Sequence, residues 1–276
     1  MDIIELLKYL LLGVVQGFTE PLPISSSGHL VLLQELLGIG INDLNFEIIV
    51  NAASLFAILF LFRNDIIKIV TGFINYIIKK DKTEYKVDFN YALMIVIGVI
   101  PAGLIGFIGK DFIESNLKGV SIVGIGLLIT AFALHLIGKN ATKNEITDIT
   151  FKDALVIGVF QVFALIPGIS RSGSTMVGGL SRKIKFEETM RFSFMLYIPI
   201  SLAGLLLSVY DMITATNTDI FIEGYVVAFL ASLFMTYFAV KWLYKVVRSG
   251  NLKWFSLYCV VVGVTAIIGN YLVEVL

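Results

Sequence analysis

The sequence has few charged residues and a single cysteine, and these shortages limit the kind of protein it can encode. Only 15% of its 276 residues are charged, whereas 57% are hydrophobic. The mean hydropathy is +0.89. A soluble domain of this length could not cover so much apolar surface with so few charges. The lone cysteine, Cys259, excludes an internal disulfide and a thiolate metal cluster.

The sequence also lacks an excess of either charge and any linker-like stretch. Lys and Arg together number 21, as do Asp and Glu, so the formal net charge is zero. A nucleic-acid partner is therefore not expected. There are only five prolines, and no Pro-rich, Ser-rich or low-complexity tract divides the chain. We expect a single membrane-embedded domain over residues 1–276.

Long hydrophobic runs are what the sequence does contain. Six segments approach the roughly 20 apolar residues that a helix needs to cross a bilayer. They cover residues 46–62, 90–108, 119–138, 187–209, 223–244 and 254–274. Residues 65–79 have an amphipathic pattern and are expected to lie at the membrane interface. The predicted fold class is an all-α integral membrane protein with about six transmembrane helices.

Two further apolar segments are interrupted by proline and serine. Residues 3–18 are helix-like and run into the stretch 19–27, after which a short helix is expected over about 29–37. Residues 154–166 run into Pro167-Gly168 and a second serine cluster before a short helix to about 180. Irregular backbone at membrane depth is tolerated only inside protein or beside a water-filled cavity. Both segments are therefore predicted to be re-entrant helical hairpins.

These two broken segments are copies of each other. Gly158 lies 145 positions after Gly13, and at this offset eight of the eighteen residues from Gly13 to Leu30 are identical to their counterparts. The alternative is that the two segments are unrelated stretches rich in helix-packing residues. Unrelated stretches would not be expected to share identical residues in the same order. Three spans follow each copy, which places the second copy upside down. The sequence predicts an inverted-topology repeat, with copies over residues 1–138 and 152–276.

Basic residues predict the orientation of the chain in the cell membrane. One expected face holds only Lys8, Lys110 and Lys118. The other holds Arg63, Lys68, Lys79, Lys80, Lys82, Lys86, Lys139, Lys143, Lys152, Arg182, Lys183, Lys185, Lys245, Arg248 and Lys253. By the positive-inside rule the basic face is cytoplasmic, so both termini are expected outside the cell.

Ionisable groups at membrane depth cost about 2.5–3.5 kcal/mol each on insertion scales, and those that remain are usually functional. The first hairpin contains Glu20 and His29, and the second contains Arg171. A guanidinium and two helix N-termini suit a phosphate, whereas Glu20 suits a base or a ligand to a divalent cation. This combination favours phosphoryl transfer. The surrounding hydroxyls belong to Thr19, Ser25, Ser26, Ser27, Ser170, Ser172, Ser174 and Thr175.

The same residues also have structural interpretations. Glu20 and Arg171 could pair only to hold the hairpins together, and His29 could be a donor at a helix start. The serines could be helix caps or packing contacts.

The sequence resembles the BacA-type undecaprenyl-diphosphate phosphatases. The resemblance rests on QGFTE at 16–20, PISSSGH at 23–29 and PGISRSGST at 167–175, and the pattern of spans extends it over essentially the whole chain. It implies a membrane enzyme that removes the terminal phosphate from a C55 polyprenyl diphosphate. The product is the monophosphate that carries cell-wall precursors, and the family is associated with bacitracin resistance.

The resemblance also implies roles for individual residues and a divalent cation, Mg²⁺ or Ca²⁺. By position, Glu20 is the essential carboxylate and metal ligand, Ser26 the proposed nucleophile, His29 the proposed acid or base, and Arg171 the diphosphate clamp. Two positions depart from the family: residue 16 is Gln where many members have Glu, and Pro21 stands where the residue is usually aromatic. The residues expected to bind substrate are Gln16, Ser25, Ser27, Gly168, Ser170, Ser172, Ser174 and Thr175.

Two alternatives stay open on the sequence alone. The attacking group is either Ser26 or a water activated by Glu20 or His29. A transporter that flips the polyprenyl monophosphate would use the same site for binding only, since broken helices in inverted repeats are typical of secondary transporters. The expected partners are the polyprenyl diphosphate and the bilayer, and whether the chain forms a homodimer is left open.

Overall fold

The computed structural model describes residues 3–39, 44–117, 119–138, 145–214, 221–248 and 252–275. Within these ranges the chain is all-α, which confirms the predicted fold class, and the only β-structure is an isolated bridge between Ile146 and Ile184. The helices are α1 (Ile3–Thr19), α2 (Ser26–Leu36), α3 (Leu44–Leu61), α4 (Arg63–Ile78), α5 (Lys86–Asn116), α6 (Val120–Gly138), α7 (Phe151–Phe163), α8 (Arg171–Ser181), α9 (Phe186–Thr214), α10 (Ile222–Arg248) and α11 (Leu252–Val275).

Five helices of the described chain are long and apolar enough to cross a membrane, or six if one bent pair is counted as a span. The five are α5, α6, α9, α10 and α11, and they match five of the six predicted segments. The sixth prediction, residues 46–62, corresponds to α3, which is followed directly by α4 at an angle of 77°. The count agrees with the prediction of about six transmembrane helices.

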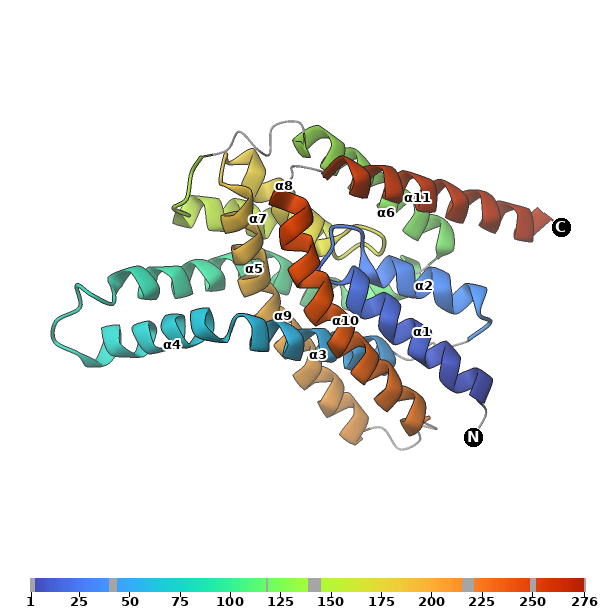
Figure 1. Ribbon diagram of the computed structural model, residues 1–276, viewed down its shortest axis with the longest axis horizontal. Coiled ribbons are helices and arrows are strands. Elements are labelled where there is room, and N and C mark those ends of the chain that lie inside the picture. Colours follow the sequence, from blue (N-terminus) through green and yellow to red (C-terminus); the bar gives the residue numbers. More distant parts are fainter. Residues whose placement is uncertain are drawn as a thin grey trace.

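The bend between α3 and α4 produces an arm that projects from the helix bundle (Figure 1). In this arm α4 packs against the first part of α5. The ring of Phe89 stacks on those of Phe73 and Tyr76, with centroids 5.2 and 4.1 Å apart. The side chain of Asp88 covers Gly72, where an added Cβ would overlap it. Residues 65–79, predicted to be amphipathic, form most of α4, and their place at the membrane interface stays a prediction.

Each broken segment folds as two short helices joined by a turn. We call α1 with α2 hairpin 1 and α7 with α8 hairpin 2. Lys8 Nζ donates to the Leu37 carbonyl at 3.0 Å and closes the base of hairpin 1. Arg182 Nε donates to Asp153 Oδ1 at 2.7 Å and closes the base of hairpin 2. Positions 8 and 37 correspond to 153 and 182 at the offset of 145, so the two copies are closed at the same places by different chemistry.

The closing ion pair of hairpin 2 depends on an ionised Asp153. Burial of this carboxyl opposes its ionisation, but hydrogen bonds from Thr150 and Arg182 outweigh burial and hold the pKa of Asp153 below its usual value. Thr150 and Asp153 also form a capping box that begins α7.

The hairpins exchange packing partners between the two halves of the chain. Hairpin 1 lays α1 along α10 of the second half, while hairpin 2 lays α7 along α5 of the first half. The contacts are close because they use equivalent glycines: Gly13 lies against the Ala228 carbonyl and Gly158 against the Gly98 carbonyl. Glycine at such positions lets two helix backbones approach. The two contacts use glycines that are equivalent at the offset of 145, as an internal repeat predicts; the inverted orientation across a membrane stays a prediction.

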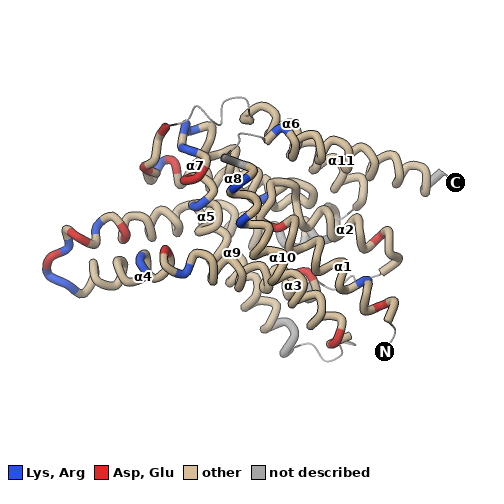
Figure 2. The backbone as a smooth tube through the Cα atoms, viewed as in Figure 1, with Lys and Arg blue, Asp and Glu red and all other residues tan. Residues whose placement is uncertain are grey.

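Most basic residues lie at one end of the molecule, whereas acidic residues lie at both ends (Figure 2). Figure 2 shows Lys, Arg, Asp and Glu concentrated at the tip of the α4–α5 arm and around the start of α7. The first turn of α1 and the last turn of α11 both lie at the other end (Figure 1). Among the basic positions used to predict orientation, Lys118, Lys139 and Lys143 lie outside the described residues, and the side chains of Lys110 and Arg248 are not described.

The glycine contacts between the halves generate a stability prediction. We expect Gly158→Ala to lower the unfolding temperature in detergent, because its methyl group would overlap the Gly98 backbone, and overpacking costs about 1–3 kcal/mol. Gly204→Ala in α9 is the matched control, since nothing lies within 4 Å of an added Cβ there. That change should be neutral or stabilising, because Gly in a helix costs roughly 0.5–1 kcal/mol relative to Ala. Equal effects of the two substitutions would contradict this packing.

Candidate functional site

The tips of the two hairpins form the same local structure. Ser25 caps α2 by accepting a hydrogen bond from the Gly28 amide at 3.3 Å, and Ser170 caps α8 by accepting one from the Gly173 amide at 3.1 Å. These four positions correspond at the offset of 145. Each cap satisfies one orphan N–H of a helix start and leaves the remaining amides available to an anion.

The two tips differ in backbone conformation. Ser25 has a φ of 67°, in the left-handed region, whereas Ser170 has an ordinary φ of −70°. A non-glycine residue held there is strained, and such strain concentrates at functional sites. In hairpin 2 the left-handed position is Gly168, with a φ of 90°, where an added Cβ would overlap the Val123 carbonyl. Gly168, predicted to bind substrate, thus shapes the turn through its backbone.

Glu20 lies at the end of α1 and connects three of the predicted site residues. Its Oε2 accepts hydrogen bonds from Ser26 Oγ and, at 3.1 Å, from Gln16 Nε2. Its Oε1 accepts one from Arg171 Nη2 at 2.8 Å. Only 6% of the Glu20 side chain is exposed. A carboxylate in contact with a serine hydroxyl on one side and a guanidinium on the other is held in a fixed position.

Arg171, the first residue of α8, lies over an aromatic ring. Its guanidinium carbon is 4.2 Å from the ring centroid of Tyr197, a cation–π contact. Tyr197 is fully buried, and its hydroxyl donates to the Asn51 carbonyl at 2.9 Å, with Asn51 Oδ1 at 3.0 Å. The second terminal nitrogen, Nη1, is buried without a hydrogen-bond partner among the described residues. An unsatisfied guanidinium nitrogen is rare in a folded protein and is what an incoming anion would satisfy.

The hairpin tips and this ion pair enclose a small polar pocket of about 50 Å³. Seven of the sequence-predicted site residues share its wall with Ala164 and Ile169; they are Glu20, Ser25, Ser26, Ser27, Ser170, Arg171 and Ser172. Ser172 Oγ also donates to the Leu22 carbonyl at 2.8 Å, which ties hairpin 2 to hairpin 1. Residues 151 positions apart, Glu20 and Arg171, are thereby brought to one point.

His29 lies one turn into α2, beside the tip but not in the wall of this pocket. Its Nδ1 is 2.7 Å from the Ser25 carbonyl oxygen and its Nε2 is 2.8 Å from the Tyr258 hydroxyl. Ser26 is bonded to Glu20 rather than to His29. A serine–histidine pair is thus not formed among the described residues, and a role for His29 as acid or base stays a prediction.

Two predicted substrate-binding residues point away from the polar pocket. Thr175 of α8 is fully buried. Its hydroxyl donates to the Arg171 carbonyl at 3.0 Å and lies 2.6 Å from the Ser193 hydroxyl. Ser174 lines a neighbouring apolar pocket instead. Gln16 is one hydrogen bond behind Glu20.

Several residues that shape the site carry only a weak sequence signal. Tyr197 and Asn51 orient Arg171 from α9 and α3, and Tyr258 bonds His29 from α11. The Thr130 hydroxyl of α6 accepts a hydrogen bond from the Ser170 amide at 3.1 Å and donates one to the Gly168 carbonyl at 3.2 Å. These two bonds fix the turn of hairpin 2. Polar residues inside predicted spans were the available hint, because each must find a partner at membrane depth.

The donor set at the site is compatible with a hard divalent cation that also binds a ligand's phosphate oxygens. No group of three or more His, Cys, Asp or Glu side chains comes together within the described residues. Mg²⁺ is commonly held by one or two carboxylates together with phosphate oxygens and waters, so a complete protein cage is not required. Glu20 supplies the carboxylate. Next to it, the buried Gln16 Oε1 lacks a hydrogen-bond partner among the described residues and could serve as a second oxygen ligand.

Comparison of the sequence with known proteins matches it to one family. Residues 9–265 match the model of a family described as the bacitracin resistance protein BacA. The chain is 50% identical to undecaprenyl-diphosphatase 1 of Bacillus cereus over 262 residues, which cover 95% of this chain and 97% of that protein. It is 43% identical to undecaprenyl-diphosphatase 1 of Bacillus licheniformis, over 97% of this chain and 99% of that protein. Undecaprenyl-diphosphatase 1 of Halalkalibacterium halodurans is 44% identical, with 94% of each chain covered.

The contact between Glu20 and Arg171 predicts a coupled effect on stability. Glu20→Gln and Arg171→Gln should each lower the unfolding temperature in detergent, because each leaves a buried charge unpaired, at a cost of about 3 kcal/mol or more. The double variant should be no less stable than the worse single variant, since it leaves neither charge behind. Additive losses in this double-mutant cycle would show that the two charges do not interact.

Proposed function

The chain belongs to the family of the bacitracin resistance protein BacA, and we propose that the polar pocket between its hairpin tips hydrolyses undecaprenyl diphosphate. The products are undecaprenyl monophosphate and inorganic phosphate. The chain is thus a membrane phosphatase that returns a lipid carrier to use in cell-wall synthesis. The observation that carries the location is Glu20, which contacts Ser26 on one side and Arg171 on the other inside one pocket.

The pocket is suited to the terminal phosphate of a diphosphate. The first turns of α2 and α8 bring backbone N–H groups and positive dipole ends to its wall. Arg171 adds a charged donor whose Nη1 has no partner among the described residues. Positioning and charge stabilisation of this kind supply most of the catalysis in phosphoryl transfer.

Ser26 is the nucleophile in this proposal. Glu20 accepts its hydroxyl proton as the oxygen attacks the terminal phosphorus, and the bond between that phosphorus and the bridging oxygen breaks. The bridging oxygen and its electron pair leave with the polyprenyl monophosphate. A water then attacks the phosphoserine, the leaving Ser26 oxygen takes back the proton held by Glu20, and inorganic phosphate is released with the protons of the water.

A divalent cation balances the charge of the substrate. Glu20 and Arg171 cancel each other, so the site itself has little net charge to offset a diphosphate. Mg²⁺ or Ca²⁺ bound by Glu20, with Gln16 Oε1 as the second protein oxygen, would neutralise phosphate oxygens when bound. Gln16 replaces a glutamate that many family members carry, so this chain brings one carboxylate fewer to the ion.

Release of phosphate from the purified protein tests the function. In detergent, the protein should release inorganic phosphate from a long-chain polyprenyl diphosphate, and a chelator should stop the reaction until Mg²⁺ or Ca²⁺ is restored. Detergent abolishes sidedness, so transport cannot produce this signal. Lipid flipping in vesicles without phosphate release under any metal condition would support the transporter instead.

Glu20 and Ser26 should be separable by substitution. Glu20→Gln should lower kcat at least about 100-fold, because an amide cannot accept the Ser26 proton, the size typical of losing a general base. Ser26→Ala should be equally inactive if the serine attacks. Gln16→Glu is the control within the same hydrogen-bonded set and should keep activity. An active Ser26→Ala beside an inactive Glu20→Gln would assign the attack to a water.

We propose that both termini lie outside the cell, with the α4–α5 turn in the cytoplasm. The support is the gathering of basic residues at the arm and the start of α7, opposite the first turn of α1 and the last of α11. In a Cys259→Ser background, a cysteine placed at Ile3 should react with an impermeant thiol reagent on intact cells, and one placed at Lys80 should not. The opposite pattern would invert the topology.

A further inference from the structure

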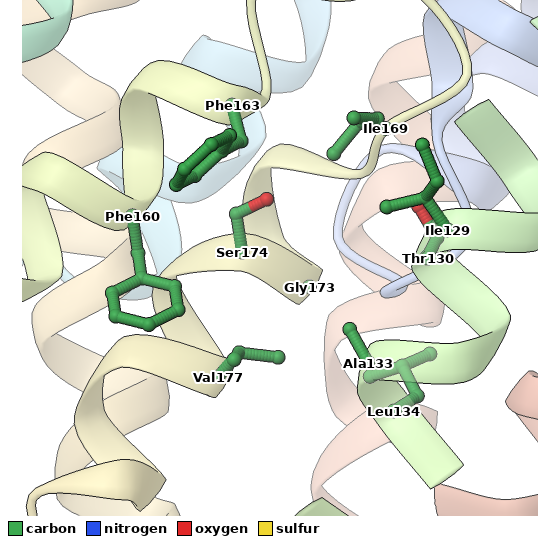
Figure 3. A pocket seen from close by; sticks show the side chains of 10 residues that line it. All are labelled: Ile129, Thr130, Ala133, Leu134, Phe160, Phe163, Ile169, Gly173, Ser174 and Val177. Atoms are coloured by element: carbon green, nitrogen blue, oxygen red, sulfur yellow. The ribbon is translucent and has the colours of Figure 1, made fainter. Parts of the chain in front are cut away.

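A second pocket lies next to the polar site and has almost no polar wall. It has a volume of about 230 Å³ and lies between α6, α7 and α8. Figure 3 shows Phe160 and Phe163 of α7 on one side, Ile129 and Ala133 of α6 on the other, and the start of α8 between them. The mechanism above does not use this space, although Ile169, Gly173 and Ser174 of the 167–175 motif lie in its wall.

The apolar pocket and the polar pocket share the turn of hairpin 2. Ile169 lines both of them. Thr130 lies in the wall of the apolar pocket, and Ser170 lies in the wall of the polar pocket. The Thr130 hydroxyl accepts a hydrogen bond from the Ser170 amide. A molecule that is anionic at one end and hydrocarbon beyond it matches this pair of adjoining spaces.

Ser174 places one polar atom where the two spaces adjoin. It is about nine-tenths buried, and it lines the wall of the apolar pocket. Its hydroxyl points into the apolar pocket from α8, one turn after the Ser170 cap (Figure 3). A hydroxyl at the polar end of a hydrocarbon pocket can donate a hydrogen bond to the ester oxygen that joins a lipid chain to its phosphate.

The rim of the pocket opens toward lipid. Phe163 is 55% exposed and Ile129 is 47% exposed, on a surface that faces the bilayer in a membrane protein. The volume is below the roughly 300–1,000 Å³ of sites that enclose a whole small ligand. The pocket therefore fits the first part of a long chain, with the remainder continuing into the membrane.

We propose that the pocket between α6, α7 and α8 binds the first isoprene units of the polyprenyl diphosphate, with Ser174 at the ester oxygen. This assignment rests on the proposed function of the polar site. It makes the chain leave between Phe163 and Ile129. It also gives the enzyme a contact that distinguishes an isoprenoid diphosphate from a free one, because apolar burial adds about 25 cal/mol per Å².

Photocrosslinking of the intact protein tests the path of the chain. The probe is a C55 polyprenyl diphosphate with a diazirine in its first isoprene unit, and labelled peptides are mapped by mass spectrometry. Label should fall on α6, α7 and α8 and disappear with unlabelled substrate. Label that falls on other helices and disappears with unlabelled substrate, in protein that still releases phosphate, would overturn this path of the chain but not the proposed function. Label in the pocket that resists competition would show ordinary bilayer chains there and overturn the assignment.

Failure of the proposed function has a different signature. In that case the protein would release no phosphate, and no helix would carry label that unlabelled substrate removes. The assignment of the apolar pocket would then be wrong as well.

A matched pair of substitutions gives an independent readout. Ala133→Phe places a ring in the pocket and should raise KM for the C55 diphosphate about tenfold, with kcat within about twofold. Ala203→Phe adds the same ring to an exposed position of α9 outside the pocket and should leave both constants unchanged. Similar constants for the two folded variants, verified by their unfolding temperatures, would contradict the assignment.

Discussion

The site depends on one buried contact, the ion pair between Glu20 and Arg171. Each charge alone would cost several kcal/mol in a low-dielectric interior, so each hairpin tip stabilises the charge on the other. The pair also fixes which atoms remain for chemistry. One oxygen of Glu20 is committed to Arg171 and the other faces Ser26, while one guanidinium nitrogen is left unsatisfied. A structural interpretation of the pair and a catalytic one are therefore compatible.

The rest of the molecule keeps this contact in place. Tyr197 supports the guanidinium from below and is itself held by Asn51, and Thr130 fixes the turn that precedes α8. These supports come from α9, α3 and α6, so three helices outside the hairpins determine the geometry of the tips. Preorganised groups of this kind cost no rearrangement when charge develops in the transition state.

Much of this architecture could be predicted from the sequence, because membrane spans and a repeat leave strong local signals. Hydropathy located the spanning helices, and the offset of 145 paired the two hairpins. The same offset relates the caps Ser25 and Ser170. The supporting residues could not be predicted, since Tyr197 and Thr130 lie in apolar helices where only tertiary packing gives them partners. Ser174 shows a further limit: it belongs to a motif, but only the structure shows that it faces a different pocket from its neighbours.

The exchange of packing partners between the halves bears on how such a site can arise. Two separate copies of a half-length chain could place α1 on the partner's counterpart of α10 and reproduce the twofold bundle. Such an assembly would carry the same residue at both tips. Here position 20 is Glu and its counterpart is Leu165, while Ser26 has Arg171 as its counterpart. A single polypeptide that holds two diverged copies lets one tip be acidic and the other basic, so a carboxylate and a guanidinium meet across an otherwise symmetric interface.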